Sequence, residues 1–381
     1  MSEARAQAVK RDARILLLRR IAAGSAAALL ITAITLTVIY RERLAANVLR
    51  GLFGGAAAAL SADAFTYEPG GEQVFAAAGN GLAMASTSAI ALFDETGTAV
   101  FRRTVSFSAP AVFASAGGAL FCDVGGTGCF AVDRRGNSLP LEPEGVIQSA
   151  SRNDSGWVAL VTDAWGYKGL VSVWDPDGRP QYRWWSGADY VLRACVSPDG
   201  KTMAALCAGE GGGTLRLFRL DSEEENAEVD FSGALPFDLC WAGDGSLCAV
   251  GTAAMWFFSE TGAETGRYDY EGVLLDYETG GADFAAVLTA PVRGASGGTL
   301  YSVDRGGRVL GSAELERGAD SLSARSKRLL AKSGNALLLF DRGLEPQWTG
   351  EAPAGTARAL LRARGDALLP GPYGAQLREI D

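Results

Sequence analysis

The sequence VSVWDPDG at residues 171–178 is the clearest copy of a pattern that recurs along the chain. Apolar side chains alternate up to Trp174, and then Asp175, two turn residues and Gly178 follow. Alternation at every second residue is typical of a β-strand. The aspartate can accept hydrogen bonds from backbone N–H groups two residues on, and glycine takes the positive φ that such a turn needs. We therefore expect the aspartate to form a turn rather than act as a catalytic acid.

The same pattern occurs in eight copies between residue 72 and the end of the sequence. Successive copies lie about 37–45 residues apart, which is the period of a propeller blade. The segments are short, β-branched and aromatic, and Gly pairs or Asp-Gly interrupt them, so each copy is predicted to be a four-stranded antiparallel sheet. Aligned on the third strand, the equivalent positions are Asp94, Asp133, Asp175, Arg219, Ser259, Asp304, Asp341 and Asp381.

The two ends of this array complement each other. The last copy stops at Asp381 after its third strand, and a strand-like segment, AFTYEP at residues 64–69, precedes the first copy. A propeller ring must close, because an open edge strand promotes aggregation. We therefore predict an all-β propeller of eight blades over residues 64–381, with residues 64–69 as the fourth strand of the last blade. Seven blades is the alternative, because the copy at Arg219 departs from the pattern.

The chain before the propeller has a different composition. Residues 1–20 are basic, and residues 21–40 carry no charged side chain. Twenty helical residues span about 30 Å, the thickness of a bilayer core. We therefore predict a cytoplasmic tail at 1–20, one transmembrane helix at 21–40 and a juxtamembrane stem at 41–63, with the propeller outside the cell membrane. A cleaved signal peptide is the competing interpretation, although its apolar region is usually about 7–15 residues long.

Composition excludes several kinds of site. The chain has no histidine, which excludes a Ser-His-Asp triad, a histidine base and a histidine-ligated metal. Its six cysteines form no CxxC pair, so we predict neither a metal site nor a cofactor. Residues 1–50 hold 9 basic and 3 acidic side chains, which leaves 26 and 41 for the rest, a net charge of −15. An acidic propeller lacks the basic face that nucleic-acid binding needs.

Three connections between the second and third strands of a blade are longer than the others, at residues 163–169, 208–213 and 290–298. In an antiparallel propeller these loops leave the same face, together with the loops between blades. We expect a binding surface there, because aromatic and arginine side chains are over-represented at binding hot spots. Ordinary loop variation is the alternative. The candidate binding residues are Trp165, Tyr167, Lys168, Glu210 and Arg293.

Four further aromatic residues follow the first of these loops. Alternation along a strand places Tyr182 and Trp184 on one side and Trp185 on the other, with Tyr190 beyond them. Such a cluster can bind a sugar, but we expect most of these side chains to pack at the seam between blades.

Cys240 and Cys248 flank the AGDG turn at residues 242–245 symmetrically, so a hairpin places them directly opposite each other. Opposed residues have Cβ atoms about 4.5–5.5 Å apart, slightly wider than the roughly 3.5–4.5 Å of a relaxed disulfide. An outside location permits disulfides without requiring them. We expect free thiols throughout, with this pair as the candidate exception.

The other four cysteines form two further pairs in sequence. Cys195 and Cys207 flank a similar turn. In the same register, Cys195 is expected to lie opposite residue 203, and Cys207 is four residues beyond that position. We therefore expect no disulfide between Cys195 and Cys207. Cys122 and Cys129 are expected on neighbouring strands of one blade, in a register that the sequence leaves open.

The SPDG turn at 197–200 and the apolar-aromatic-Asp-x-x-Gly ending resemble those of WD-repeat, quinoprotein-like and YVTN-like propellers. The chain departs from true WD repeats, because Trp-Asp occurs once, at Trp174 and Asp175, and the Gly-His dipeptide cannot occur. With its N-terminal segment, the chain looks most like a bacterial family of unknown function with one membrane span and an extracytoplasmic propeller. This resemblance is architectural and implies no functional residues.

Three functions remain open. The first, which we predict, is a non-enzymatic binding or scaffold module for a protein or cell-envelope partner on the loop-rich face, with no nucleic acid bound. The second is a hydrolase or lyase that uses paired carboxylates on envelope glycans, which needs two acids at a defined separation. Asp163, Glu210 and Asp283 are candidate acids, but no spacing distinguishes them. The third is a permanent structural subunit of an envelope complex.

Overall fold

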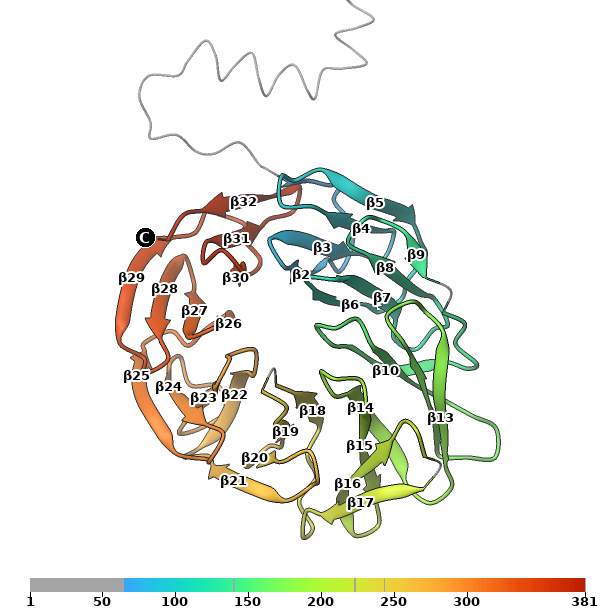
Figure 1. Cartoon of the computed structure of the whole chain (residues 1–381). Helices are drawn as coiled ribbons and strands as arrows, with labels where there is room; N and C mark the ends of the chain where they lie inside the picture. The colour runs from blue at the N-terminus through green and yellow to red at the C-terminus, as the bar shows by residue number, and fades with distance from the viewer. Residues whose placement is uncertain (1–64, 140, 223, 243, 381) are drawn as a thin grey trace, which may run out of the picture. The chain divides into compact units, whose positions relative to one another are not determined.

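The structure is a computed structural model that describes residues 65–139, 141–222, 224–242 and 244–380. These residues form eight four-stranded antiparallel sheets arranged around a ring (Figure 1). The predicted eight-bladed, all-β propeller is confirmed, and seven blades is wrong. Within the described ranges, no helix has the length and apolar character that a bilayer crossing needs. The transmembrane helix predicted at 21–40 lies outside the described residues.

The first four blades follow one another along the chain, each starting with its innermost strand. Blade 1 consists of β2 (Val74–Ala78), β3 (Gly81–Ala85), β4 (Ala89–Phe93) and β5 (Ala99–Thr104). Blade 2 consists of β6 (Pro110–Ser115), β7 (Gly118–Asp123), β8 (Cys129–Asp133) and β9 (Ser138–Leu139). Blade 3 consists of β10 (Ile147–Arg152), β11 (Val158–Thr162), β12 (Gly169–Trp174) and β13 (Pro180–Ser186). Blade 4 consists of β14 (Tyr190–Val196), β15 (Thr202–Gly209), β16 (Gly212–Arg219) and β17 (Glu225–Asp230).

The last four blades complete the ring. Blade 5 consists of β18 (Asp238–Trp241), β19 (Leu247–Val250), β20 (Ala254–Phe258) and β21 (Glu264–Asp269). Blade 6 consists of β22 (Val273–Glu278), β23 (Phe284–Ala290), β24 (Gly298–Asp304) and β25 (Val309–Leu315). Blade 7 consists of β26 (Ser321–Arg325), β27 (Arg328–Ser333), β28 (Ala336–Asp341) and β29 (Pro346–Glu351). Blade 8 consists of β30 (Leu360–Leu361), β31 (Ala367–Pro370), β32 (Gly374–Arg378) and β1 (Phe65–Thr66).

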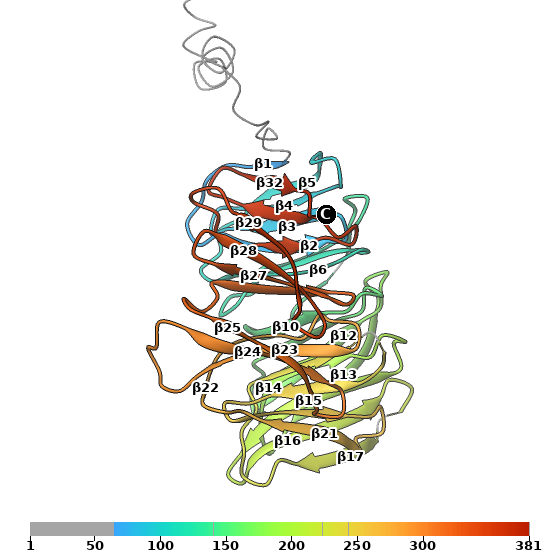
Figure 2. The ribbon, with the colours of Figure 1, turned by 90° about the vertical axis from the view of Figure 1, so that its left-hand side faces the viewer.

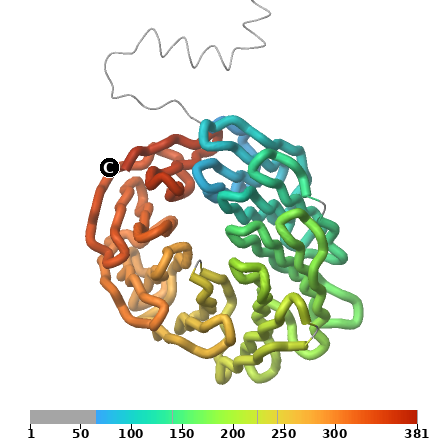
Figure 3. Tube along the Cα trace, in the orientation of Figure 1, coloured from blue at the N-terminus to red at the C-terminus, as the bar shows by residue number. Residues whose placement is uncertain are grey.

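Blade 8 joins the two ends of the described chain. The outer strand β1 pairs antiparallel with β32, with Phe65 opposite Ala375 and Thr66 opposite Gly374. Figure 2 shows β1 beside β32, and in Figure 3 the blue start of the described chain meets its red end. Phe65 is fully buried and packs edge-to-face against Phe93 of blade 1, with 5.9 Å between ring centroids. The predicted ring closure by the N-terminal strand is therefore confirmed.

The turns between the third and fourth strands repeat one hydrogen-bonding pattern. In blade 1, Asp94 Oδ1 accepts bonds from the backbone N–H groups of Thr96 (2.9 Å) and Thr98 (3.0 Å). The Thr96 hydroxyl also donates to this oxygen, and it is the main reason that the pKa of Asp94 lies below its ordinary value. Gly97 supplies the positive φ, 85°. The aspartates bond in the same way at Asp133, Asp175, Asp304 and Asp341.

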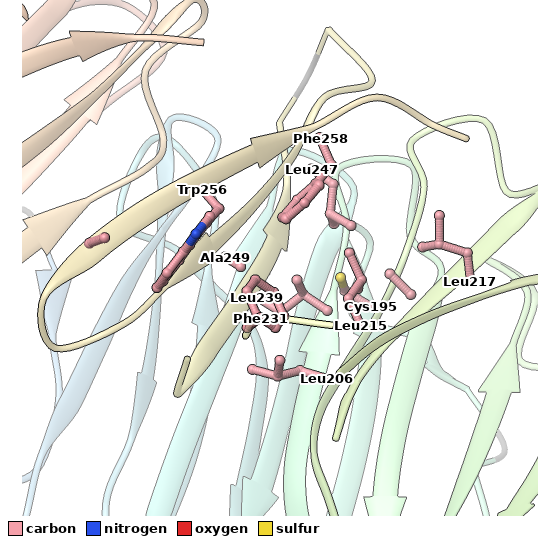
Figure 4. Packing of buried hydrophobic residues seen from close by; sticks show 12 residues of the cluster. Cys195, Leu206, Leu215, Leu217, Phe231, Leu239, Leu247, Ala249, Trp256 and Phe258 are labelled. Atoms are coloured by element: carbon pink, nitrogen blue, oxygen red, sulfur yellow. The ribbon is translucent and has the colours of Figure 1, made fainter. Parts of the chain in front are cut away.

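Hydrophobic clusters fill the seams between neighbouring blades. Figure 4 shows the seam between blades 4 and 5, where Leu206 and Leu215 lie opposite Leu239 and Trp256, all buried. Successive residues of a strand point to opposite sides. Leu206 of β15 therefore faces this seam, whereas Cys207 faces the seam with blade 3. Because the second strand of a blade is covered on both sides, it is apolar at consecutive positions rather than at alternate ones.

The cysteine registers follow from the length of each hairpin turn. Cys240 lies directly opposite Cys248, as predicted. Cys195, however, lies opposite Ala204 rather than residue 203, so this prediction was wrong by one position. The reason is a turn one residue longer than that of blade 5, in which the Ser197 hydroxyl oxygen accepts bonds from the N–H groups of Lys201 and Thr202, at 3.2 and 3.0 Å. All six cysteines are free in the structure.

Candidate binding site on the rim face and channel

One face of the ring carries the loops between the second and third strands of each blade together with the loops between blades, and we call it the rim face. Adjacent strands alternate in direction, so each first strand leaves this face and each second strand returns to it. The predicted connections lie here, and two of them are long, at residues 163–168 in blade 3 and 291–297 in blade 6. The connection predicted to be long in blade 4 is a turn of residues 210–211, so that prediction was wrong, because β15 and β16 extend to Gly209 and from Gly212. Candidate residues from the connections of blades 3 and 4 belong to adjacent blades.

Five side chains of blades 3 and 4 form a cluster that we call the aromatic rim patch. Trp165 is fully exposed. Tyr167 lies against Trp185, with 6.5 Å between the ring centroids. Lys168 Nζ lies 4.6 Å from the centre of the Tyr190 ring and donates to its hydroxyl at 3.3 Å. A cation over an exposed aromatic ring contributes about 0.5–1 kcal/mol, which favours this arrangement of the patch.

The aromatic run after the loop divides between two environments. Tyr182 and Trp184 pack against Phe218 of blade 4, at 6.2 and 4.7 Å between centroids, so seam packing is confirmed for them. It is wrong for Trp185 and Tyr190, which are 43% and 60% exposed. Outer strands of other blades, such as β17 and β29, also expose alternate residues. Trp185 lies on the exposed side of β13, opposite to Trp184, and faces solvent.

Glu210 and Arg293 occupy different parts of the rim face. Glu210 is exposed in the turn of blade 4, close to Tyr190, because Tyr190 pairs with Ala208 across the sheet. Arg293 belongs to blade 6, beyond blade 5, and borders a cavity of about 320 Å³ that Phe237 also lines. The structure thus brings Trp165, Tyr167, Lys168 and Glu210 onto adjacent blades and places Arg293 apart from them.

Exposed hydrophobic side chains concentrate at this face. Among the described residues, ten large hydrophobic side chains are exposed, and nine of them lie on the rim face or toward that end of the strands. These nine are Trp165, Tyr167, Trp185, Tyr190, Leu235, Phe237, Leu275, Val292 and Tyr373. A concentration of exposed apolar groups on one face is typical of an interaction surface.

The opposite face has a different character. The tenth exposed hydrophobic side chain, Val309, lies there at the start of β25. The turns on this face carry aspartates that bond their own backbone and ion pairs such as Arg219–Asp221, at 2.6 Å, and Lys201–Asp199, at 3.1 Å. The charged side chains of these turns are already bonded within the turns, which is typical of a solvent-exposed face. The rim face is therefore the stronger candidate for binding.

The inner strands of blades 2 to 5 line a cavity of about 690 Å³ in the central channel. Within it, Asp238 accepts bonds from Arg193 Nε, at 3.2 Å, and from the hydroxyl of Tyr277, at 2.6 Å. Ser149 Oγ and Trp241 Nε1 are buried and have no partner among the described residues. The sequence reasoning missed this cavity, although the polar residues within first strands were a signal for it.

The candidate acids are not brought together. Asp163 Oδ1 accepts a bond from the backbone N–H of Val146, at 2.5 Å, and Asp283 pairs with Arg342. Both aspartates are therefore engaged in structural contacts, and Glu210 stands alone in its exposed turn.

Two other acidic side chains lie near each other on an inner strand of blade 6. Asp276 and Glu278 alternate on β22, so they share one side of the strand. Burial raises the pKa of both, and the negative charge of Asp276 adds to the rise for Glu278, which reaches about 7. Among the described residues, no group of three or more His, Cys, Asp or Glu side chains could hold a metal ion.

Residues 65–310 match a family model described as "Family of unknown function (DUF5711)". The chain belongs to this family. The match begins at β1 and ends within β25, so it covers most of the ring. The predicted resemblance to a propeller family of unknown function is confirmed. No curated protein matches the sequence.

Solved structures with the same fold are distant in sequence. BamB from Moraxella catarrhalis is 11% identical with a TM-score of 0.54, over 80% of this chain and 96% of that one. The C-terminal WD40 domain of Sif2 is 10% identical with a TM-score of 0.58, over 84% and 98%. The dihydro-heme d1 dehydrogenase NirN is 13% identical with a TM-score of 0.53, over 75% and 66%. Since these neighbours include a WD40 domain and a dehydrogenase, the fold alone does not decide the function.

Proposed function

We propose that this protein is a membrane-anchored binding or scaffold module whose rim face binds a protein partner in the cell envelope. The observation that carries the proposal is the concentration of exposed hydrophobic side chains on that one face. Nine of the ten exposed large hydrophobic side chains in the described residues lie there or toward that end.

The composition of the aromatic rim patch supports a protein partner. Tryptophan and tyrosine are enriched at interface hot spots, where rigid rings bury a large area on binding. Trp165 and Tyr190 expose such rings, and the Tyr167 and Trp185 rings lie against each other in the free protein. Aromatic side chains that already pack against each other in the free protein lose less conformational entropy on binding, and this favours higher affinity.

The charges beside the patch add specificity. Lys168 and the exposed Glu210 belong to adjacent blades and border the aromatic rings. Charged groups at the edge of an interface set the approach and register of a partner more than they add to the affinity. We therefore expect a partner with an apolar centre and mixed charges at its margin.

The anchor is part of the proposal and rests on composition. The basic residues 1–20 precede the uncharged residues 21–40, which places the N-terminus in the cytoplasm and the propeller outside. Protease added to intact cells stripped of their wall should degrade the propeller. Cleavage confined to the first twenty residues contradicts this orientation.

Site-directed photocrosslinking in intact cells tests the binding role. A photoreactive amino acid at position 167 or 190 should give one dominant adduct with a protein, and the same group at position 309 should not. Val309 is the matched control, because it is 48% exposed but lies at the opposite end of the strands. Equal adducts from both faces contradict the proposal. Turnover of envelope glycans by the purified protein, with no adduct, favours the hydrolase or lyase instead.

A further inference from the structure

Two cysteine pairs of this chain lie directly opposite each other across antiparallel strands. Cys122 of β7 faces Cys129 of β8 in blade 2, and Cys240 of β18 faces Cys248 of β19 in blade 5. Both pairs flank a short turn, between the second and third strands of blade 2 and between the first and second strands of blade 5. The two pairs differ in the kind of position they occupy in the backbone ladder.

Residues opposed in an antiparallel ladder alternate between hydrogen-bonded and non-hydrogen-bonded pairs. In blade 2, the N–H of Asp123 donates to the carbonyl of Gly128 at 2.9 Å. Cys122 and Cys129 are the next pair along, and they therefore occupy a non-hydrogen-bonded position. Side chains are closest at such positions, where the Cβ atoms lie about 4.5 Å apart. This separation is just within the range of Cβ distances found in disulfides, which extends to roughly 4.5 Å.

The pair in blade 5 occupies the other kind of position. There the N–H of Ala242 donates to the carbonyl of Ser246 at 2.8 Å. Cys240 and Cys248 lie two residues further along, so they return to a hydrogen-bonded position. Cβ atoms at such a position lie about 5.5 Å apart, wider than a relaxed disulfide accepts. The Cys240 thiol donates to the Thr279 hydroxyl, at 3.2 Å, and a hydrogen bond with Cys248 lowers its pKa.

The sulfur atoms of the pair in blade 2 lie close together. Cys122 Sγ and Cys129 Sγ lie 3.5 Å apart, already within mutual contact. Bond formation at about 2.05 Å needs only small rotations of the two side chains. Cys122 is fully buried, whereas Cys129 is half-buried beside the exposed Gly125 and Thr127 of the turn. A soluble oxidant can therefore reach the pair through Cys129.

We propose that Cys122 and Cys129 form a redox-sensitive dithiol that closes to a cross-strand disulfide, while Cys240 and Cys248 remain reduced. This inference is independent of what the rim face binds. The sequence favoured Cys240 and Cys248 as the candidate disulfide. The ladder position favours Cys122 and Cys129 instead.

The reaction is thiol–disulfide exchange with a small-molecule disulfide such as oxidised glutathione. The Cys129 thiolate attacks one sulfur of the oxidant, forms a mixed disulfide and releases one thiolate. Cys122 then loses its proton and attacks the Cys129 sulfur, which forms the cross-strand bond and releases the second thiol. Two protein thiols are oxidised and one disulfide is reduced to two thiols. The hydrogen bond with Cys129, and burial, raise the pKa of Cys122, so Cys122 keeps its proton until the mixed disulfide has formed at Cys129.

Peptide mapping of the full-length protein tests the proposal. The protein is equilibrated in glutathione buffers of increasing oxidised fraction, acid-quenched, alkylated and cleaved on the N-terminal side of aspartate. Asp123 lies between Cys122 and Cys129, and Asp244 lies between Cys240 and Cys248. Cleavage therefore separates each pair into two peptides that only a disulfide holds together. We expect two of the six thiols to disappear, with the peptides of Cys122 and Cys129 joined.

Matched variants strengthen the assignment. Cys129→Ser should abolish the thiol loss, and Cys240→Ser, at a similarly half-buried position, should preserve it. A disulfide between Cys240 and Cys248 contradicts the part of the proposal that keeps this pair reduced. Retention of all six thiols in the most oxidising buffer overturns the proposal, and so does oxidation of Cys240 and Cys248 first. The wild-type map decides the matter even where a variant fails to fold.

Discussion

The hydroxyl of Tyr67 donates a hydrogen bond to the carbonyl oxygen of Gly371 at 2.8 Å, although the two residues lie 304 positions apart in the sequence. The backbone N–H of Tyr67 also donates to the carbonyl of Tyr373, at 3.1 Å. These bonds continue the pairing of β1 with β32 and join the first and last blades. The stability of the whole ring should therefore depend on a short N-terminal segment.

Replacement of Phe65 by alanine tests this dependence. The side chain is fully buried against Phe93, so its loss should lower the free energy of unfolding by about 3–5 kcal/mol. Tyr67→Phe, which removes one hydrogen bond and keeps the ring, should cost only about 1 kcal/mol. Denaturant unfolding measures both. A cost for Phe65→Ala below that of Tyr67→Phe contradicts closure through β1.

Trp165→Ala should separate binding from stability. Because Trp165 is fully exposed, the free energy of unfolding should change by less than about 0.5 kcal/mol. The affinity for the proposed protein partner should fall about tenfold or more, the loss expected at a hot spot. Val309→Ala on the opposite face is the control and should leave affinity unchanged. A titration of the partner against the three proteins checks the prediction, and equal affinities exclude the patch as the binding site.

The turn aspartates should be worth more than exposed ion pairs. Asp304 Oδ1 accepts from the N–H groups of Gly306 and Arg308, at 2.9 and 3.0 Å, so Asp304→Ala should cost about 1–2 kcal/mol of unfolding free energy. Asp304→Asn keeps this acceptor and should cost less. Asp177→Ala, which removes a pair with Arg179 at 3.0 Å, should cost at most about 1 kcal/mol. The reverse order in denaturant unfolding would show that charge, rather than the turn, matters.

Glu278 should make stability depend on pH. Burial raises its pKa to about 7 from an ordinary 4.5, so the folded protein binds this proton more tightly than the unfolded chain does. Its contribution to stability is therefore full below about pH 4.5 and is lost as the pH rises through about 7.

Glu278→Gln removes this titration. Between pH 4.5 and pH 8 the variant should gain up to about 3 kcal/mol relative to the wild type, the free energy equivalent of that pKa difference. Unfolding across this pH range measures the gain. Glu210→Gln, at an exposed turn, is the control and should follow the wild-type profile. Parallel profiles for Glu278→Gln and the wild type would mean that the carboxyl titrates normally.

Several features followed from local sequence because local forces determine them. Alternation and turn residues predicted each strand pair around Asp94, Asp133 and Asp175, since an aspartate and a glycine close the same turn wherever they occur. Blade 7 is an exception, because Leu344 takes the positive φ, 62°, there. Ring closure was also predictable, because one missing strand at one end matched one extra strand at the other.

Other features depended on turn geometry and packing that the repeat pattern does not show. The register of Cys195 moved by one residue because the Ser197 hydroxyl holds a wider turn. Trp185 is exposed because it lies on the outward side of the outer strand β13, which no property of residue 185 itself indicates. The candidate acids of the loops separated, whereas Asp276 and Glu278 met within an inner strand.

The sequence by itself thus determined the repeat period, the turn aspartates and the way the ring closes, and it favoured eight blades over seven, because periodicity and turn chemistry act within about 40 residues. It also named Trp165, Tyr167 and Lys168. Only the tertiary structure decided which neighbours these residues have, and which ladder position each cysteine pair occupies. Exposure and cross-strand distance depend on adjacent blades and on the alternation of ladder bonds, and both are set only when the strands pack.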